Sequence, residues 1–362
     1  MRIFLYAQHL LGVGHLKRAT LLVETLSSKG HQVLLVTGGL PNQNLLQNLP
    51  SICQLPPLYT KDENFELLTR SGNKADSLYM NQRQKILFDA FDAFKPDLLI
   101  TEHFPFGRHM FKGELISLLE KAKNKHVKIL ASVRDILISL SPSKIFKIKE
   151  ILNNYYDAVL IHGDEKCAVY WTDYTHLKTQ LFFTGYIYKK INQTFIHDDL
   201  WDQKPVLAFQ GGRNTDYNWL DLLREAKPKT IFKNNPWIII GAQNNDYLKE
   251  GIIIQESIFD LSNKLTQCAF IISEAGYNSF LEIVLSEVPS LFIPFYTSKE
   301  DEQFKRLQLY KKDMNLNYLN LPFMNAASIQ NQLNPTNMTK KNSLSLDIDG
   351  LNKSAKIIND LI

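Results

Sequence analysis

Cysteine is rare in this chain, and its positions exclude two common uses. Cys53, Cys167 and Cys268 lie far apart, and none belongs to a CxxC pair, so we expect neither a disulfide framework nor a zinc site. Long apolar runs are missing as well, because polar residues interrupt every stretch before the ~18 residues that a membrane span requires. These absences favour a protein of the reducing cytoplasm, either soluble or peripheral at the inner face of a membrane.

A marked excess of one charge is also absent. The formal net charge is +4, from 41 Lys and Arg residues against 37 Asp and Glu residues. Charges mixed in this way do not indicate a nucleic-acid surface, although a small anionic ligand such as phosphate stays open. With 44% hydrophobic and 22% charged residues, the chain of 362 residues can bury a core and is long enough for two domains.

The N-terminal segment has the pattern of a βαβ unit. A strand-like run, "RIFLYA", precedes Gly12 and Gly14, which fit a tight turn. Apolar residues then recur at helical spacing up to position 26, and a second strand-like run starts at His31. The pattern predicts strand, glycine turn, helix and strand, with His15 and Arg18 in the first turn of the helix.

Strand-like and helical segments alternate along most of the chain. The rhythm is interrupted near residues 184–193, and a second series begins with "KPVLAFQGGRN". We therefore predict an α/β fold with two Rossmann-like, doubly wound domains that face each other across a cleft. The first spans residues 1–185 and the second residues 186–349, and an amphipathic helix follows at residues 350–362.

Polar residues gather where the strands of the first domain are expected to end, which is where α/β proteins bind ligands. Glu102 and His103 follow one strand, Arg134 and Asp135 the next, and His162 a third. An ordinary structural role is open for each of them. A histidine at a strand end is often a satisfied core residue, and Arg134 with Asp135 can form a plain salt bridge or cap.

Residues 271–310 carry the strongest pattern in the second domain. An apolar strand leads into a glycine loop and a helix start, whose free backbone N–H groups suit a phosphate. One turn further, Glu282 suits a pair of ribose hydroxyls, and the next strand leads to Glu302 and Gln303, which can bind sugar hydroxyls. The strand end, loop and helix start include Ser273, Ala275, Gly276, Tyr277, Asn278 and Ser279.

These motifs, taken in order, resemble those of a known family. "GVGHLKR", "VTGG", "QLPPL", "SVRDIL", "DAVLIHGD", "TGY", "EAGYNSFLE" and "EDEQ" recur in sequence from residue 1 to about residue 310. The chain is similar to GT-B glycosyltransferases of family 28, which includes the lipid-linked peptidoglycan GlcNAc transferase, and most similar to a bacterial group of predicted glycosyltransferases. The resemblance implies the GT-B architecture, with a terminal helix that in relatives returns to the N-terminal domain.

The resemblance also implies how the donor is held. A nucleotide-diphosphate sugar, most often UDP-linked, would bind as substrate, with its diphosphate at residues 276–279, its ribose at Glu282 and its sugar at Glu302 and Gln303. Gly211 and Gly212 match the glycine loop that flanks the diphosphate. Arg213 stands where relatives usually carry a third glycine, so it either stiffens this loop or contacts phosphate. No metal and no cofactor is implied.

Sugar transfer with inversion needs a general base for the acceptor hydroxyl and neutralisation of the leaving diphosphate. His15 is the candidate base, because the ordinary pKa of histidine lies near neutral pH and related enzymes often place a histidine or an acid there. Asp135 and Glu102 are alternatives for orienting it, and Arg18 is a candidate for holding an acidic acceptor. The acceptor side would comprise Gly12, Gly14, Arg18, His103, Arg134 and His162.

Three functions follow from this pattern. We favour an inverting, metal-independent glycosyltransferase with an unknown hydroxyl acceptor. A nucleotide-sugar hydrolase in which His15 activates water is the first alternative, and a non-catalytic nucleotide-sugar binding protein is the second. A lipid-linked acceptor would make the basic helix around Lys144, Lys147 and Lys149 a membrane-docking face, whereas a solvated face is the simpler interpretation of those lysines.

Overall fold

The computed structural model describes residues 1–10, 12–60, 66–189, 198–209, 220–240, 251–255, 258, 261–298, 300–320, 324–334 and 346–361. The chain forms two compact units. The first contains residues 1–189 and 346–362, and the second contains residues 190–345. Gly211, Gly212 and Arg213 lie outside the described residues.

The first unit is built on a parallel sheet, with seven strands in its described part in the order β3-β2-β1-β6-β7-β8-β9. A two-stranded antiparallel ladder, β4-β5, lies apart from it. The strands are β1 (Arg2–Ala7), β2 (Gln32–Thr37), β3 (Ile52–Gln54), β4 (Leu58–Tyr59), β5 (Leu68–Thr69), β6 (Leu98–Glu102), β7 (Lys128–Arg134), β8 (Ala158–His162) and β9 (Gln180–Phe183).

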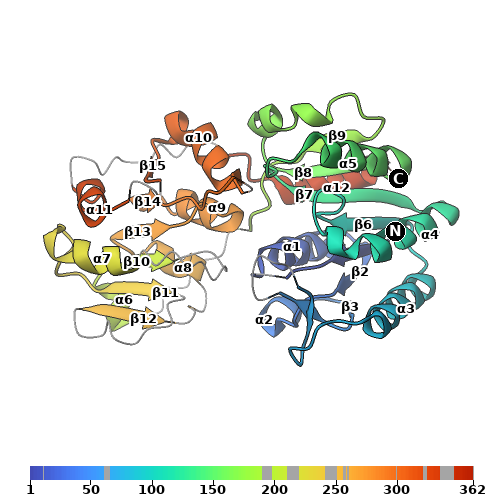
Figure 1. Ribbon diagram of the computed structural model, residues 1–362, viewed down its shortest axis with the longest axis horizontal. Coiled ribbons are helices and arrows are strands. Elements are labelled where there is room, and N and C mark those ends of the chain that lie inside the picture. The colour runs from blue at the N-terminus through green and yellow to red at the C-terminus, as the bar shows by residue number, and fades with distance from the viewer. Residues whose placement is uncertain are drawn as a thin grey trace. The chain divides into compact units, whose positions relative to one another are not determined.

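Helices cover both faces of this sheet, because successive strand residues point to opposite faces. Ile3 and Leu5 of β1 share a buried cluster with α1 and α12, whereas Phe4 and Tyr6 share another with α3, α4 and α5. In Figure 1, the red α12 lies with the blue and green elements of this unit. The helices are α1 (Gly14–Ser28), α2 (Gln43–Leu46), α3 (Ser77–Phe94), α4 (Lys112–Asn124), α5 (Pro142–Tyr155) and α12 (Gly350–Leu361).

The last helix joins this unit through the segment that precedes it. The backbone N–H of Tyr186 donates to the carbonyl of Asp347 (2.6 Å), and Ile187 forms a bridge with Asp349. Gly185 has φ +81°, a conformation that favours glycine, and a Cβ there would lie 2.6 Å from the Asp347 side chain. The "TGY" motif therefore contacts residues 347–349 and fixes the point at which the chain returns to the first unit.

The second unit has the same architecture. In its described part, six parallel strands follow the order β12-β11-β10-β13-β14-β15. They are β10 (Val206–Phe209), β11 (Trp237–Ile240), β12 (Ile252–Gln255), β13 (Phe270–Ser273), β14 (Ser290–Phe292) and β15 (Asn317–Tyr318). The helices are α6 (Asp199–Asp202), α7 (Leu220–Ala226), α8 (Leu261–Leu265), α9 (Tyr277–Leu285), α10 (Glu302–Met314) and α11 (Ala326–Gln332).

Both sheets confirm the predicted doubly wound α/β architecture. Each has its first strand in the interior and parallel neighbours on both sides, which is the arrangement that alternating strands and helices produce. No helix among the described residues is long and apolar enough to cross a bilayer.

Candidate active site

The β1–α1 turn places His15 and Arg18 at the carboxyl edge of the first sheet. Gly12 has φ +61°, so glycine suits the turn, and α1 begins at Gly14. His15 is therefore the second residue of the helix, in its first turn as the sequence predicts, whereas Arg18 is the fifth residue and begins the second turn rather than lying in the first. The side chain of His15 is 17% exposed, whereas that of Arg18 is buried.

Glu102, at the end of β6, contacts both residues. Its two carboxylate oxygens lie 2.9 Å from His15 Nδ1, and Oε1 lies 2.7 Å from Arg18 Nη2. Arg18 Nη2 also lies 2.9 Å from Nδ1, but it donates to Glu102 at the shorter distance of 2.7 Å. A carboxylate only accepts hydrogen bonds, so the contact of Nδ1 with Glu102 is satisfied when Nδ1 carries the imidazole proton. Nε2 then keeps its lone pair and can take a proton, which is the tautomer that a general base requires.

The electrostatic surroundings keep this imidazole neutral. Desolvation lowers the pKa of His15 well below its ordinary value, and the guanidinium groups of Arg108, Arg18 and Arg134 lower it further. The pKa of His103, whose ring centroid lies 4.9 Å from that of His15, is lowered for the same reasons. Both rings are therefore uncharged at neutral pH.

Asp135 and His162 lie beneath this edge and have structural partners. The Asp135 carboxylate accepts a hydrogen bond from the Tyr186 hydroxyl (3.1 Å), and both residues are fully buried. Glu102, rather than Asp135, is thus the carboxylate in contact with His15. His162 is also fully buried, with its ring nitrogens 2.7 Å from Ser132 Oγ and 3.0 Å from Thr184 Oγ1.

These contacts correct two expectations. His162 was expected on the acceptor side, but a buried imidazole with both nitrogens engaged is a core residue, and desolvation lowers its pKa to about 3. Asp135 was expected as an alternative partner of the base. Its carboxylate instead accepts a hydrogen bond from Tyr186, the residue whose backbone binds Asp347 before α12. His103 and Arg134, which is half-buried, remain at the edge with Arg18.

The structure adds two residues that the sequence analysis did not select. His9 follows β1 directly, and its Nε2 lies 3.0 Å from the carbonyl of Leu40. Arg108 lies in the turn after β6, with φ +62°, and its Nε donates to the carbonyl of Gln8 (2.6 Å). A strand that ends in "QH" was a usable signal for His9. Nothing in the spacing of the sequence marks Arg108.

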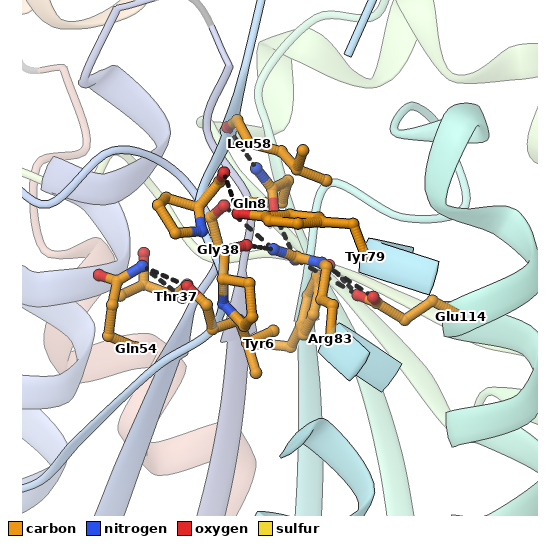
Figure 2. Close-up of polar contacts among 12 residues, drawn as sticks. Tyr6, Gln8, Thr37, Gly38, Gln54, Leu58, Tyr79, Arg83 and Glu114 are labelled. Atoms are coloured by element: carbon orange, nitrogen blue, oxygen red, sulfur yellow. Dashed lines mark hydrogen bonds and ion pairs between the residues drawn. The ribbon is translucent and has the colours of Figure 1, made fainter. Parts of the chain in front are cut away.

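A buried ion pair supports this edge from below (Figure 2). Arg83 of α3 and Glu114 of α4 are 2.9 Å apart between Nε and Oε2, and both are buried. Tyr6 Oη donates to Glu114 Oε1 (2.7 Å), and Arg83 Nη2 donates to Gln8 Oε1 (2.6 Å). The Gln8 amide, in turn, donates to the carbonyls of His9 and Leu58. The network therefore fixes the end of β1.

The same network explains two sequence motifs. A Cβ on Gly38 of "VTGG" would lie 2.0 Å from Arg83 Nη2, and one on Gly39 would lie 2.3 Å from the His9 ring. Arg83 Nη1 donates to the carbonyls of Gly38 (3.1 Å) and Pro56 (2.8 Å), which joins "VTGG" to "QLPPL". Gly38 and Pro56 are thus positioned by Arg83, whereas Gly39 is required by close packing against the His9 ring.

In the second unit, β13 ends at Ser273 and α9 begins at Tyr277. Gly276 precedes the helix with φ −59° and ψ 154°, a conformation that any residue adopts, and a Cβ there would meet nothing within 4 Å. The fold itself does not require glycine at this position. Asn278 and Ser279 in the first turn and Glu282 in the second are half-buried, whereas Ser273 is buried and its hydroxyl donates to the Glu274 carbonyl.

Gln303 holds the loop that leads into α9. Its Oε1 accepts from the backbone N–H groups of Ala275 (3.0 Å) and Phe295 (2.9 Å), and its side chain is buried. Arg306, fully buried, donates to the Ala275 carbonyl (2.6 Å) and lies 3.5 Å from Glu302 Oε2. The amide oxygen of Gln303 is thus bound to two loops, while its amide nitrogen lies 3.3 Å from Glu274 Oε2, and its contact with a donor sugar stays a prediction. Glu302 is likewise buried beside Arg306.

The described residues contain no cluster of three or more His, Cys, Asp or Glu side chains suited to a metal ion. The basic helix α5 exposes Lys144, Lys147 and Phe146, whose side chain is 62% exposed, while Lys149 is half-buried.

Comparison with known proteins shows a short similarity in sequence and a similarity in fold over the whole chain. No model of a known protein family matches the chain. A stretch of 60 residues is 43% identical to the UDP-N-acetylglucosamine–N-acetylmuramyl-(pentapeptide) pyrophosphoryl-undecaprenol N-acetylglucosamine transferase of Wolbachia pipientis subsp. Culex pipiens (strain wPip). That match covers 16% of this chain and 18% of the relative, so the chain spans less than a fifth of the curated relatives that it matches.

Solved structures are similar over the whole chain. MurG of Acinetobacter baumannii has a TM-score of 0.58 at 15% identity, covering 100% of this chain and 99% of its own. The Streptomyces sp. SF2575 glycosyltransferase SsfS6, complexed with thymidine diphosphate, has a TM-score of 0.59 at 15% identity, and the match covers 99% of each chain. The chain therefore has the fold of the GT-B glycosyltransferases, as the sequence predicts.

Proposed function

We propose that this protein is a metal-independent glycosyltransferase that moves a sugar, with inversion, from a nucleotide-diphosphate sugar to a hydroxyl acceptor. The contact of Glu102 with His15 carries the proposal. It gives the carboxyl edge of the first sheet a neutral imidazole whose free nitrogen can accept a proton. An imidazole that a carboxylate orients at this edge, where α/β folds bind ligands, is suited to act as a general base.

The chemical step follows from this assignment. His15 Nε2 takes the proton of the acceptor hydroxyl as its oxygen attacks C1 of the donor sugar. The bond between C1 and the diphosphate oxygen breaks, and the electron pair leaves with the nucleotide diphosphate. Glu102 holds Nδ1–H and stabilises the imidazolium that forms, which offsets the repulsion from the surrounding arginines.

The donor is assigned to the start of α9. Backbone N–H groups of a first helical turn have no acceptor within the helix and attract a phosphate. Gly276 leaves the space beside them open, although the backbone there does not require glycine. Gln303 and Arg306 keep the loop in place from behind. A UDP-linked donor is favoured by the local likeness to a UDP-N-acetylglucosamine transferase.

The test measures binding and turnover separately. We would titrate the protein with UDP, thymidine diphosphate and their sugars by calorimetry, and then follow radiolabelled donor with and without candidate hydroxyl acceptors. His15→Ala is expected to lower turnover by about 10²–10⁴-fold, the range for loss of a general base, with an unchanged dissociation constant for the nucleotide. The exposed His126, replaced by alanine, is the matched control.

The same assay decides between transfer and hydrolysis. Rapid release of free sugar without an acceptor, lost in His15→Ala, would identify a hydrolase in which His15 activates water. Binding without any turnover that depends on His15 would leave a nucleotide-sugar binding protein. Equal turnover of His15→Ala and the parent protein would refute the assigned base.

A lipid-linked acceptor is a further part of the proposal. The curated relative acts on a pyrophosphoryl-undecaprenol substrate by name, and α5 exposes Lys144 and Lys147 around Phe146. Such a face can adsorb to an anionic bilayer. Liposome sedimentation of the parent protein and of Lys144→Glu with Lys147→Glu tests this, and equal pelleting of the two would remove α5 as the docking face.

A further inference from the structure

Arg108 is a cation beside the proposed base, and the carboxylate that acts most strongly on its charge is Glu102. Its Nε donates to the Gln8 carbonyl (2.6 Å), which anchors the half-buried side chain. Among the described residues, it forms no ion pair. The nearby Glu102 is already engaged by Arg18 at 2.7 Å and by His15 at 2.9 Å. A half-buried guanidinium that is held by one hydrogen bond and left without an anion is poised to bind one.

The charge of this guanidinium acts on three histidines. It lowers the pKa of His9, His15 and His103, in each case after desolvation. The imidazoles are therefore uncharged and do not compete with Arg108 for an anion. The charged groups that act on His15 are Arg108, Arg18 and Arg134 together with Glu102, so cations outnumber carboxylates in its immediate surroundings.

Two of these histidines have a buried ring nitrogen without a protein partner. His9 is 6% exposed and His103 is 8% exposed, and Nδ1 of each is unsatisfied. His9 Nε2 faces the Leu40 carbonyl and must donate to it, so its Nδ1 is an open acceptor that suits a hydroxyl of a ligand rather than its anionic group. Buried polar atoms in native proteins are almost always hydrogen-bonded, and exceptions indicate a ligand or ordered water.

His103 and Arg108 lie in the same turn and share an unusual backbone conformation. Both adopt left-handed conformations, with φ +65° and φ +62°, which are uncommon for residues other than glycine and occur often at functional sites. Gly107 between them lets the His103 ring pack closely, because a Cβ there would lie 2.5 Å from ring atom Cδ2. The turn after β6 therefore holds both side chains in one place.

We propose that Arg108 binds an anionic group of the acceptor, a phosphate or a carboxylate, next to His15. That the ligand is the acceptor rests on the proposed function. The existence of an anion site at Arg108 does not depend on it. An anion on Arg108 removes part of the positive field on His15, so the pKa of His15 rises towards its ordinary value. A bound acceptor would thus strengthen the base that deprotonates it.

The test uses the full chain labelled with ¹³C and ¹⁵N in histidine and followed by NMR. Methyl phosphate and acetate are the two probes, and they distinguish a phosphate-bearing from a carboxylate-bearing acceptor. We expect saturable shifts of the His15 and His103 ring signals, with His31, His126 and His176 unmoved. In Arg108→Gln the dissociation constant of the preferred anion should rise at least about tenfold, the size of a lost charge-assisted hydrogen bond.

Two further variants serve as controls for the role of the Arg108 charge. Arg108→Lys keeps the charge and should bind the anion more tightly than Arg108→Gln, while Lys85→Gln, which removes an exposed cation, should bind as the parent protein does. The ring signal of the buried His162 reports that each variant is folded. An unchanged dissociation constant in Arg108→Gln, or the absence of saturable shifts with both anions, would overturn the site.

Calorimetry with nucleotide diphosphates on the same samples separates the two proposals. Anion binding that depends on Arg108 without any nucleotide binding would sustain the site and refute the glycosyltransferase. Nucleotide binding without an anion effect would sustain the enzyme and refute the site.

Discussion

Replacing Arg83 by methionine should destabilise the first unit severely. Arg83 is fully buried, and its guanidinium bonds Glu114, Tyr6, Gln8 and the carbonyls of Gly38 and Pro56. Removing one partner of a buried ion pair costs about 3–5 kcal/mol, because it leaves the other charge uncompensated. The Pro56 carbonyl, left without a donor, adds about 1–3 kcal/mol, whereas the Gly38 carbonyl still accepts from the backbone N–H of Leu58. The expected loss is thus about 5 kcal/mol or more, a large part of the stability of a typical domain.

A double variant tests whether the uncompensated charge is the reason. Arg83→Met with Glu114→Leu removes both charges, and buried ion pairs replaced by apolar residues often lose little stability. The double variant should therefore be about 2–3 kcal/mol more stable than Arg83→Met alone, although the Pro56 carbonyl still lacks its donor.

Hydrogen exchange measured by mass spectrometry reports each unit separately. Peptides from β1, β2 and α3 should exchange faster in Arg83→Met, whereas peptides from β13 and α9 should keep their protection. A loss below about 1 kcal/mol in the first unit would refute the reasoning. So would a double variant no more stable than Arg83→Met, because the cost would then lie in packing rather than in charge.

Three shorter predictions follow from other contacts. Gly38→Ala places a Cβ 2.0 Å from Arg83 Nη2, so urea unfolding should show a loss of about 3 kcal/mol in the first unit, and a loss under about 0.5 kcal/mol would contradict the packing. Gly276→Ala meets no atom within 4 Å, so thermal unfolding should be unchanged while calorimetry shows weaker nucleotide binding; unchanged binding would argue against a diphosphate at this position. The pKa of His162 falls to about 3 on folding, so the unfolded state binds more protons between that value and the ordinary 6.5, and stability falls as the pH falls. Between pH 7 and pH 5, His162→Asn should lack about 2 kcal/mol of the decline seen in the parent protein, and equal slopes would show that His162 is not the titrating group.

Much of the architecture could be predicted from local pattern. Alternation of apolar strands with amphipathic helices determines a doubly wound sheet, and residues after apolar runs must lie at the strand ends. Glu102 and His15 were identified in this way, since both follow strand or turn signals in the sequence. The order of the strands then brings β1 and β6 side by side and unites the two residues.

The partners of each polar residue could not be predicted in the same way. Gln303 and His162 have side chains suited to a ligand, but both are bound to groups distant in sequence: Gln303 to the backbone of Ala275 and Phe295, and His162 to Ser132 and Thr184. Arg108 shows the reverse case. His103 lies five residues before it in the sequence, but the fold alone brings Arg108 near His9 and His15, which lie about a hundred residues away.

The packing of α12 on the first unit affects the order in which the chain can fold during synthesis. It also determines how the first unit could be produced alone. Ala355 and Ile358 fill the same core as Leu16 and Leu22, so this core stays open during synthesis until the whole second unit has left the ribosome. Tyr186 and Asp347 are already hydrogen-bonded neighbours. A short glycine linker from Lys189 to Leu346 could therefore replace residues 190–345 and yield the first unit, with its base and anion site, as a small autonomous protein.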